Sequence, residues 1–388
     1  MQRLRLDNFG IQQSDDHQLI YGHVGGEKLY FKTLFDPDRN TPAPRPGAEP
    51  FICALLMPAM QAGVTLEMPA ELQASRTFLD NIGVAQEIFS SWYPDLSKVS
   101  IDVNVDVDVD VASAPAEAGN SHCATFFSGG VDACYTLLKE QDKLTHLVYA
   151  RGIDMQLDRE TLWQQCLAHN QQIADQFNKT LVAVETNVRF FIRRISSPDI
   201  GWNQAVGTGM ASLAQSLGFA RTLISSSNTY RALHPYGSHP LTDPLFSSEA
   251  VQIIHNGCEA SRHEKLMRVA SDERLLPHLR VCWQDNGFNC GHCDKCLHFR
   301  MALRLLDLRA GGLEPLTDFS ELRHAHTGNL GEYIEWEDNL VLARKVGDRA
   351  AVKALQKILN RYKRKQLLKL ADELLLNGRL LALRQRRA

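Results

Sequence analysis

Short apolar runs alternate with helical segments from residue 122 onward, and this alternation constrains the fold more than any other feature of the chain. The runs CATFF, THLVYARG, TLVAVETN and RTLISSSN have the composition of strands, and segments with helical spacing of apolar residues separate them. Strands joined through helices of this length form βαβ units, and these build a parallel sheet with helices on both faces. We therefore expect an α/β fold with a ligand site beyond the carboxyl ends of its strands.

The sequence on either side of this region differs from it in composition and in the pattern of apolar residues. Residues 1–115 combine short strands, Gly and Asp/Asn turns and a helical pattern, which predicts an N-terminal α+β domain of unknown role. The stretch 112–121 is small and contains proline, as is typical of a linker. The α/β domain is expected over 122–305. Residues 306–388 are expected to form a helical region that is strongly basic toward its end.

Residues 101–111, IDVNVDVDVDV, alternate strictly between apolar and polar or acidic side chains. Period two places the valines on one face of a strand and the aspartates on the other. The pattern favours a half-buried strand with a solvated acidic face. A calcium-binding ladder is the alternative, but parallel side chains along one strand face do not wrap around an ion.

Composition bounds the class of protein and its compartment. The chain has 388 residues, is 44% hydrophobic and 22% charged, and carries a formal net charge of -3, as expected of a globular protein in water. No apolar stretch approaches the roughly 18 to 20 residues of a membrane span, and the first residues lack the apolar core of a signal peptide. We expect a cytoplasmic protein that does not enter a membrane.

The stretch FFSGGVDACY, residues 126–135, lies between a predicted strand and a predicted helix. Two glycines allow a positive φ and expose backbone N–H groups, while the positive end of the following helix points to the same place. Ser128 can add a hydroxyl donor, and Asp132 can cap amides or hold a magnesium ion. The stretch predicts an anion site; an ordinary strand-to-helix turn capped by serine or aspartate is the alternative.

Four of the nine cysteines crowd into CWQDNGFNCGHCDKC, in the order Cys282, Cys290, Cys293 and Cys296. In a reducing compartment this spacing indicates metal binding rather than disulfides. Four thiolates close a tetrahedron around zinc and leave no open position, so the ion would be structural. An iron–sulfur cluster and unliganded core cysteines are the alternatives, and His292 could compete as a ligand.

The arrangement of strand, SGGVD and helix resembles the PP-loop of the ATP pyrophosphatases, whose usual form is Ser-Gly-Gly-x-Asp-Ser; Ala133 stands where that family has the last serine. The resemblance implies that the loop holds the β- and γ-phosphates of ATP, and that attack on the α-phosphate gives an adenylate and pyrophosphate. It implies ATP and Mg²⁺ as cofactors, with Ser128 and Asp132 in catalytic roles. The nucleotide-binding residues in the loop would be Phe127, Ser128, Gly129, Gly130, Val131 and Asp132.

A PP-loop domain followed by this cysteine spacing is similar to the 7-cyano-7-deazaguanine synthase family, which makes the nitrile of queuosine-type deazapurines and carries Zn²⁺. The resemblance covers residues 122–305, and the regions outside it resemble extended forms found in antiviral defence operons. It places adenine beside the YARGID stretch, at Ala150, Arg151 and Gly152. It places the substrate on residues 225–244, where we single out Asn228, Tyr230, Arg231, His234, Tyr236, His239 and Asp243.

The family chemistry would make this chain an ATP-dependent C–N ligase. A deazapurine carboxylate attacks ATP, ammonia displaces AMP from the acyl-adenylate, and a second adenylation dehydrates the amide to the nitrile. In this scheme Asp243 accepts a hydrogen bond from a guanine-type N–H edge. A protein partner bound through residues 1–115 or the basic tail is favoured over a nucleic acid, because the tail has no interleaved aromatic residues.

Two other interpretations stay open. Zinc-containing PP-loop enzymes also thiolate tRNA, and such an enzyme would use a catalytic cysteine, for which Cys134 and Cys258 are the candidates. A PP-loop fold kept as a non-catalytic binding scaffold is the third interpretation, and Ala133 is its best support.

Overall fold

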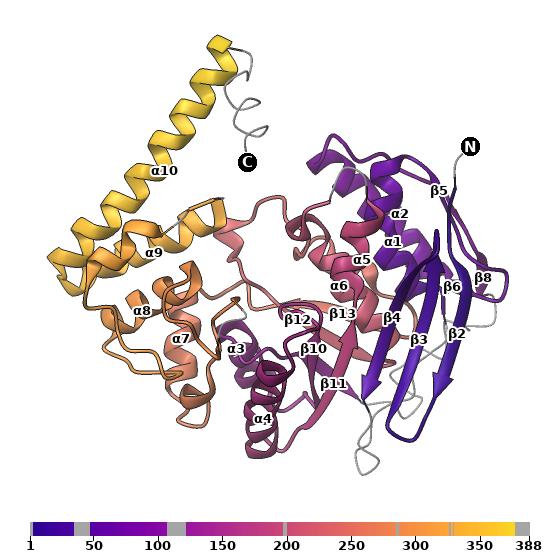
Figure 1. Ribbon diagram of the computed structural model, residues 1–388, viewed down its shortest axis with the longest axis horizontal. Coiled ribbons are helices and arrows are strands. Elements are labelled where there is room, and N and C mark those ends of the chain that lie inside the picture. Colours follow the sequence, from indigo (N-terminus) through magenta and orange to yellow (C-terminus); the bar gives the residue numbers. More distant parts are fainter. Residues whose placement is uncertain are drawn as a thin grey trace. The chain divides into compact units, whose positions relative to one another are not determined.

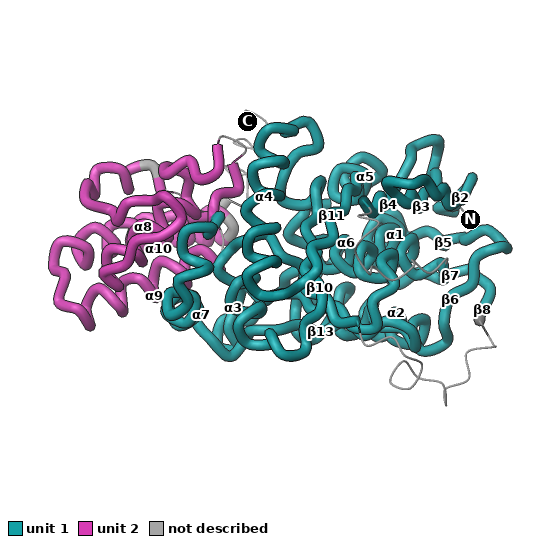
Figure 2. Tube along the Cα trace, turned by 90° about the horizontal axis from the view of Figure 1, so that it is seen from below, with its two compact units in different colours: residues 1–280 teal, residues 281–388 magenta. Residues whose placement is uncertain are grey.

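The computed structural model describes residues 3–34, 47–106, 122–196, 200–284, 287–325, 327–328 and 330–376. The chain divides into two compact units, Met1–Arg280 and Val281–Ala388, which Figure 2 shows in different colours. These boundaries differ from the expected division into 1–115, 122–305 and 306–388. Each unit is therefore described separately below.

The first unit is built on an eight-stranded mixed sheet whose strands lie in the order β13-β12-β9-β10-β11-β4-β3-β2 (Figure 1). One half of the sheet is parallel, as the alternation of strands and helices predicts. Its strands in chain order are β9 (Cys123–Phe126), β10 (His146–Arg151), β11 (Thr180–Thr186), β12 (Arg221–Ser225) and β13 (Gln252–Asn256). The expectation of an α/β fold with a parallel sheet is confirmed.

The N-terminal strands extend this same sheet instead of forming a separate domain. Strand β4 (Glu27–Leu34) pairs antiparallel with β11, and β3 (His17–Val24) and β2 (Asp7–Gln13) follow it. Without β4, the outer edge of β11 would present a row of unpaired backbone N–H and C=O groups. This pairing makes the N-terminal region part of the larger unit, which continues past the predicted boundary near residue 115 as far as Arg280.

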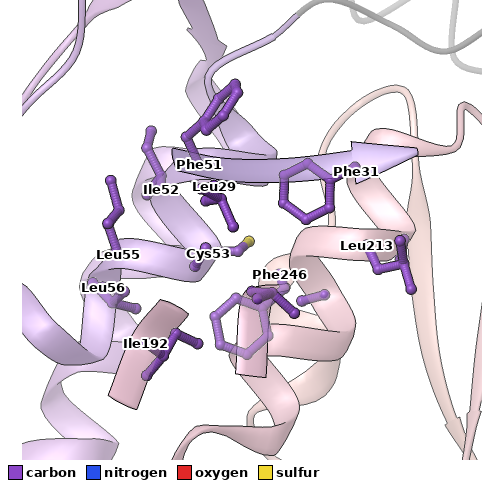
Figure 3. Close-up of a cluster of buried hydrophobic side chains, with 14 of the residues drawn as sticks. Leu29, Phe31, Phe51, Ile52, Cys53, Leu55, Leu56, Ile192, Leu213 and Phe246 are labelled. Carbon is purple, nitrogen blue, oxygen red and sulfur yellow. The ribbon is translucent and has the colours of Figure 1, made fainter. Parts of the chain in front are cut away.

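A buried N-terminal helix strengthens this joining. All residues from Pro50 to Met60 in α1 (Glu49–Ala62) are buried, as expected of a helix that is apolar on every side. Figure 3 shows side chains of α1, among them Phe51 and Leu55, in one core with Ile192 of α5 (Val188–Ile195) and Leu213 of α6 (Trp202–Ser216). One apolar core thus contains residues from both sides of the predicted linker.

The other helices and short strands of this unit complete its layers. Residues 101–106 form two short strands, β7 (Ile101–Asp102) and β8 (Asn104–Asp106), instead of one, and residues 107–111 lie outside the described ranges. Between residues 101 and 105 exposed and half-buried positions alternate as predicted. The remaining elements are β1 (Arg3–Arg5), β5 (Thr65–Glu67), β6 (Gln73–Ser75), α2 (Arg76–Trp92), α3 (Val131–Glu140), α4 (Glu160–Gln176), α7 (Arg262–Ala270) and the 3-10 turns Tyr230–Ala232, Asp243–Phe246 and Leu276–His278.

The second unit is helical and has a core of its own. It contains α8 (Asp294–Leu306), α9 (Leu330–Val346), α10 (Arg349–Leu376) and the 3-10 turn Phe319–His324, while the chain between α8 and that turn is irregular. Met301 of α8, Trp336 of α9 and Leu355 of α10 are buried in the same cluster. The cysteine segment belongs to this unit, because Cys296 and Leu297 are consecutive residues of α8. The predicted grouping of these cysteines with the parallel sheet therefore differs from the structure.

No helix within the described residues is both long enough and apolar enough to cross a membrane.

Candidate functional site

The order of the parallel strands identifies one position for a ligand. From β9 the chain proceeds outward through β10 and β11, and then returns to the other side of β9 to form β12 and β13. In open α/β sheets, ligands bind beyond the carboxyl ends of the two strands where the order reverses. Here these are β9, which ends at Phe126, and β12, which ends at Ser225. The predicted anion loop follows β9 directly, so it lies at this switch point.

The loop has the backbone geometry of an anion site. Gly129 has φ of 75°, in the left-handed region, and a Cβ there would lie 2.9 Å from Asn170 Oδ1. Gly130 is the N-cap of α3, and no side chain caps this end of the helix. Phe127 is buried, and its carbonyl accepts a hydrogen bond of 3.5 Å from Asn170 Nδ2. The first amides of α3 are therefore directed at the turn without a capping side chain.

Asp132, in the first turn of α3, is held by two cations. Its carboxylate lies 3.1 Å from Lys265 Nζ and 3.2 Å from an Arg262 nitrogen, both on α7. The Lys265 side chain is only 2% exposed and also donates to the carbonyl of Ser226 at 2.6 Å. Asp132 therefore links the loop to the end of β12. Each of its two oxygens is ion-paired, and its role as a ligand for Mg²⁺ stays a prediction.

The other loop residues lie at the turn and at the start of α3. Ser128 and Gly130 are half-buried at the turn, while Val131 and Ala133 are buried on α3. The side chain at position 133 therefore packs against other residues of the protein and is closed to solvent.

The three residues predicted to face adenine lie at or just beyond the end of β10, beside β9. Arg151 is 8% exposed and pairs with Glu160 at 2.8 Å and with Glu185 at 3.6 Å. Gly152 has φ of 90°, and a Cβ there would be 1.7 Å from the carbonyl oxygen of Thr186. Through these contacts Arg151 and Gly152 hold the loop that follows β10 against β11. Ala150 is half-buried beside them.

The predicted substrate segment divides into an outer and an inner set. Tyr230 is 65% exposed and Arg231 is exposed, while Asn228, His234 and Tyr236 are half-buried. Asn228 reaches the switch point, where its backbone N–H donates to Ser226 Oγ at 3.2 Å. All five side chains are at least partly exposed to solvent, as contact with a ligand requires.

His239 and Asp243 form the inner set and are buried. Asp243 is fully buried, and its carboxylate accepts from Ser238 Oγ at 2.7 Å and from the His239 N–H at 3.2 Å. It also pairs with His255 Nδ1 at 2.7 Å. A carboxylate enclosed in this way organises its own loop and does not face a ligand, in contrast to the predicted contact with a guanine-type edge.

The sequence interpretation did not identify His255, and it considered Cys258 without a partner. Burial opposes the positive charge of His255, but hydrogen bonds with Asp243 and Cys258 outweigh it and raise its pKa to about 9. Burial raises the pKa of the Cys258 thiol, yet hydrogen bonds with His255 and Ser226 lower it by more. The buried Cys134 thiol behaves oppositely, since burial and then Asp132 raise its pKa.

The four predicted metal ligands come together in the second unit. The sulfur atoms of Cys282, Cys290, Cys293 and Cys296 all lie within 4.8 Å of one another. The Cys282–Cys293 and Cys290–Cys296 sulfur distances are 3.8 and 3.9 Å. A zinc–sulfur tetrahedron with bonds of about 2.3 Å has edges of about 3.8 Å, so this donor set could hold a metal such as zinc.

Neighbouring side chains fix the geometry of this metal cluster. Asn289 Oδ1 accepts from the N–H groups of Val281 and Cys282, and Arg300 donates to the carbonyl of Gly291 at 2.9 Å. His292 is exposed and its Nδ1 lies 2.7 Å from the carbonyl oxygen of Cys290. His292 therefore lies outside the cluster, as expected if the four cysteines are the metal ligands.

The sequence motifs do not identify several groups that contact the loop or its Asp132 carboxylate, namely Asn170, Arg262, Lys265 and Arg280. Arg262 and Lys265 follow Ser261, which caps α7 with Glu264, so the S-x-x-E pattern marks their helix but not their contact with Asp132. Comparisons with known proteins found no matching protein-family model, no matching curated protein and no matching solved structure.

Proposed function

We propose that this protein binds a nucleoside triphosphate at the switch point between β9 and β12 and uses it to activate a carboxylate as an adenylate. The observation that carries the proposal is the Ser128–Gly130 turn at the head of α3, placed at the reversal of strand order. Loop amides and a helix N-terminus stabilise phosphate oxygens, and ion-paired Lys265 and Arg262 lie beside them. ATP is the nucleotide that the resemblance suggests.

Residues of the chain would have defined roles in this reaction. The loop amides and Ser128 would stabilise the charge of the departing pyrophosphate. Half-buried His234 and Tyr236, whose rings lie 6.0 Å apart, would hold a planar carboxylate substrate of the deazapurine class. Zinc bound by the four cysteines would have a structural role, because four thiolates leave no coordination position for a substrate.

The test is formation of AMP and pyrophosphate from ATP in the presence of candidate carboxylates, with 7-carboxy-7-deazaguanine first among them. Replacing Ser128 by alanine removes one donor to the leaving group, and we expect a loss of turnover of about 100-fold. Lys143→Ala is the matched control, because that side chain is 70% exposed and pairs with Glu140. Absence of AMP and pyrophosphate with every carboxylate would contradict the proposal and favour a nucleotide-binding scaffold.

A second candidate function, thiol-dependent sulfur transfer, is favoured by one observation. Cys258 has a hydrogen-bonded histidine and a thiol pKa below its ordinary value. Cys258→Ser would abolish turnover by a sulfur-transfer enzyme, whereas an adenylating ligase would keep its AMP formation. Cys134→Ser serves as the control, since the thiol it replaces is fully buried and has a raised pKa.

A further inference from the structure

Arg280 carries a buried positive charge that the described residues do not neutralise. Its side chain is among the buried polar groups, with the whole residue 6% exposed. The Nε atom and one terminal nitrogen of its guanidinium have no hydrogen-bond partner among the described residues. None of the described carboxylates forms an ion pair with it, although Arg262, Lys265 and Arg274 all have such partners.

Such a group needs an explanation. Arginine stays charged at any physiological pH, so it cannot relieve the cost of burial by losing a proton. Burying a charge without a partner costs several kcal/mol, and buried polar groups in proteins are almost always hydrogen-bonded. A guanidinium presents its donors in a planar fork that matches phosphate and carboxylate oxygens. The missing partner is therefore expected to be an anionic ligand.

The position of Arg280 identifies which ligand. Its backbone N–H donates to the carbonyl of Gly129 at 2.9 Å, so it lies directly against the glycine turn. A Cβ on Gly129 would lie 4.0 Å from the Arg280 Cβ, and one on Gly130 would lie 3.5 Å from its carbonyl oxygen. The uncapped N-terminus of α3, a helix of 10 residues, begins at the same turn. Two independent features, the helix end and the residue that carries the orphaned guanidinium, thus meet at one place.

The surrounding charges favour an anion as well. Asp132 is the carboxylate of the turn, and two cations on α7 already engage it. His169 and His278 lie behind the turn with their Nδ1 atoms 2.8 Å apart, and one of them must donate to the other. Burial and the neighbouring His169 lower the pKa of His278, which favours its neutral form, so this histidine adds no charge to the turn. The cations of the turn therefore outnumber its carboxylates.

We propose that Arg280 binds the phosphate oxygens of a ligand seated on the Ser128–Gly130 turn, and that it is the main side-chain contact for the pyrophosphate part of a nucleotide. The nucleotide form of this inference rests on the proposed function. Phosphate binding itself does not, because inorganic pyrophosphate can be tested alone.

The experiment measures binding of inorganic pyrophosphate and of ATP by calorimetry, and the melting temperature with and without each ligand, for the full chain and for Arg280→Met and Arg280→Lys. We expect Arg280→Met to weaken pyrophosphate binding by about 10- to 100-fold, because a charge-assisted hydrogen bond to the ligand is lost. Arg280→Lys keeps the charge and should lose less. Arg274→Met is the matched control from the same segment, since that side chain is 42% exposed and pairs with Asp272.

The melting temperature separates a ligand contact from a structural one. Without ligand, Arg280→Met should melt at the same temperature as the parent or higher, because a buried unpaired charge is gone. Its stabilisation by a given concentration of pyrophosphate should fall in step with the weaker binding. A variant that melts lower and still responds to pyrophosphate overturns the inference, and so does a parent protein that binds neither ligand. Binding that depends on Arg280, without AMP formation from ATP, supports the inference and contradicts only the proposed function.

Discussion

The metal cluster and the switch-point site are both polar clusters, but their residues come together in different ways. All four cysteines of the metal cluster lie within one segment, 282–296. The switch-point site takes Ser128 and Asp132 from one segment, Lys265 from another and Arg280 from a third. Short turns are enough to bring the cysteines together, whereas the second site depends on an entire sheet. The two sites should therefore respond differently to the same kind of damage.

Removal of the metal ligands should give the largest effect. Cys296→Ala, or a strong chelator, should abolish stoichiometric zinc binding and unfold the segment around the cluster, because structural zinc binding contributes about 10 to 16 kcal/mol in small domains. Metal analysis and hydrogen exchange over residues 282–306 check this. The strands β9 to β13 should keep their slow exchange, since their hydrogen bonds are formed within the first unit.

The control for this prediction is His292→Ala. The His292 side chain is exposed and its Nδ1 contacts a backbone carbonyl, so the variant should bind zinc as the parent does. Loss of zinc in this variant would show that the histidine replaces one of the cysteines as a ligand.

A smaller effect is expected at the inner edge of the switch-point site. Burial lowers the pKa of His255, but hydrogen bonds with Asp243 and Cys258 outweigh it and raise this pKa to about 9, from an ordinary value near 6.5. The protonated histidine thus contributes stability that is fully present below about pH 6.5 and is lost as the pH rises through about 9. Asp243→Asn removes the Asp243 part of this shift and should lower the free energy of unfolding by about 2 kcal/mol at pH 6, and by less at pH 9.

Urea denaturation of parent and variant across this pH range measures the difference. Cys258 also faces His255, and its lowered pKa makes its own contribution rise toward pH 9, so the two proteins must be compared at each pH. His239 is a further titratable neighbour, whose pKa burial lowers. A cost of Asp243→Asn that is independent of pH would contradict the assigned pairing.

The smallest effect distinguishes two adjacent glycines of the loop. Gly129→Ala should cost about 1 to 2 kcal/mol, because φ of 75° strains any residue with a Cβ and Asn170 Oδ1 lies 2.9 Å away. Gly130→Ala should cost less than about 1 kcal/mol, since its φ of -80° suits alanine and Ser128 Oγ, 3.3 Å away, can turn aside. Urea midpoints check both, and equal costs would contradict this backbone geometry.

The parts of the structure that local patterns control were predictable from the sequence. The period of the apolar residues gave the parallel strands, and the spacing from Cys282 to Cys296 gave the full ligand set. The joining of the N-terminal strands to the parallel sheet could not be predicted, because the pairing of β4 with β11 joins residues about 150 positions apart. Composition changes at a linker, but it carries no information on which edge strand the preceding region covers.

The candidate site was predictable only in its backbone. Gly129 and Gly130 mark the turn in the sequence, since positive φ favours glycine. Nothing in the sequence around Lys265 or Arg280 distinguishes them from surface cations, and nothing around Asp243 indicates that His255 is its partner. Their contacts depend on which strands are adjacent, and that is a property of the sheet order.

The sequence by itself determined the alternation of strands and helices, the glycine turn after β9 and the four thiolates of the metal cluster. In each of these, the deciding interactions act within about 15 residues of chain. Only the tertiary structure decided that residues 7–34 complete the eight-stranded sheet, that Asp132 is engaged by Lys265, and that Arg280 is buried against Gly129 without an ion-pair partner among the described residues. Burial and pairing of a charge depend on what the rest of the chain places around it, and no local pattern records that.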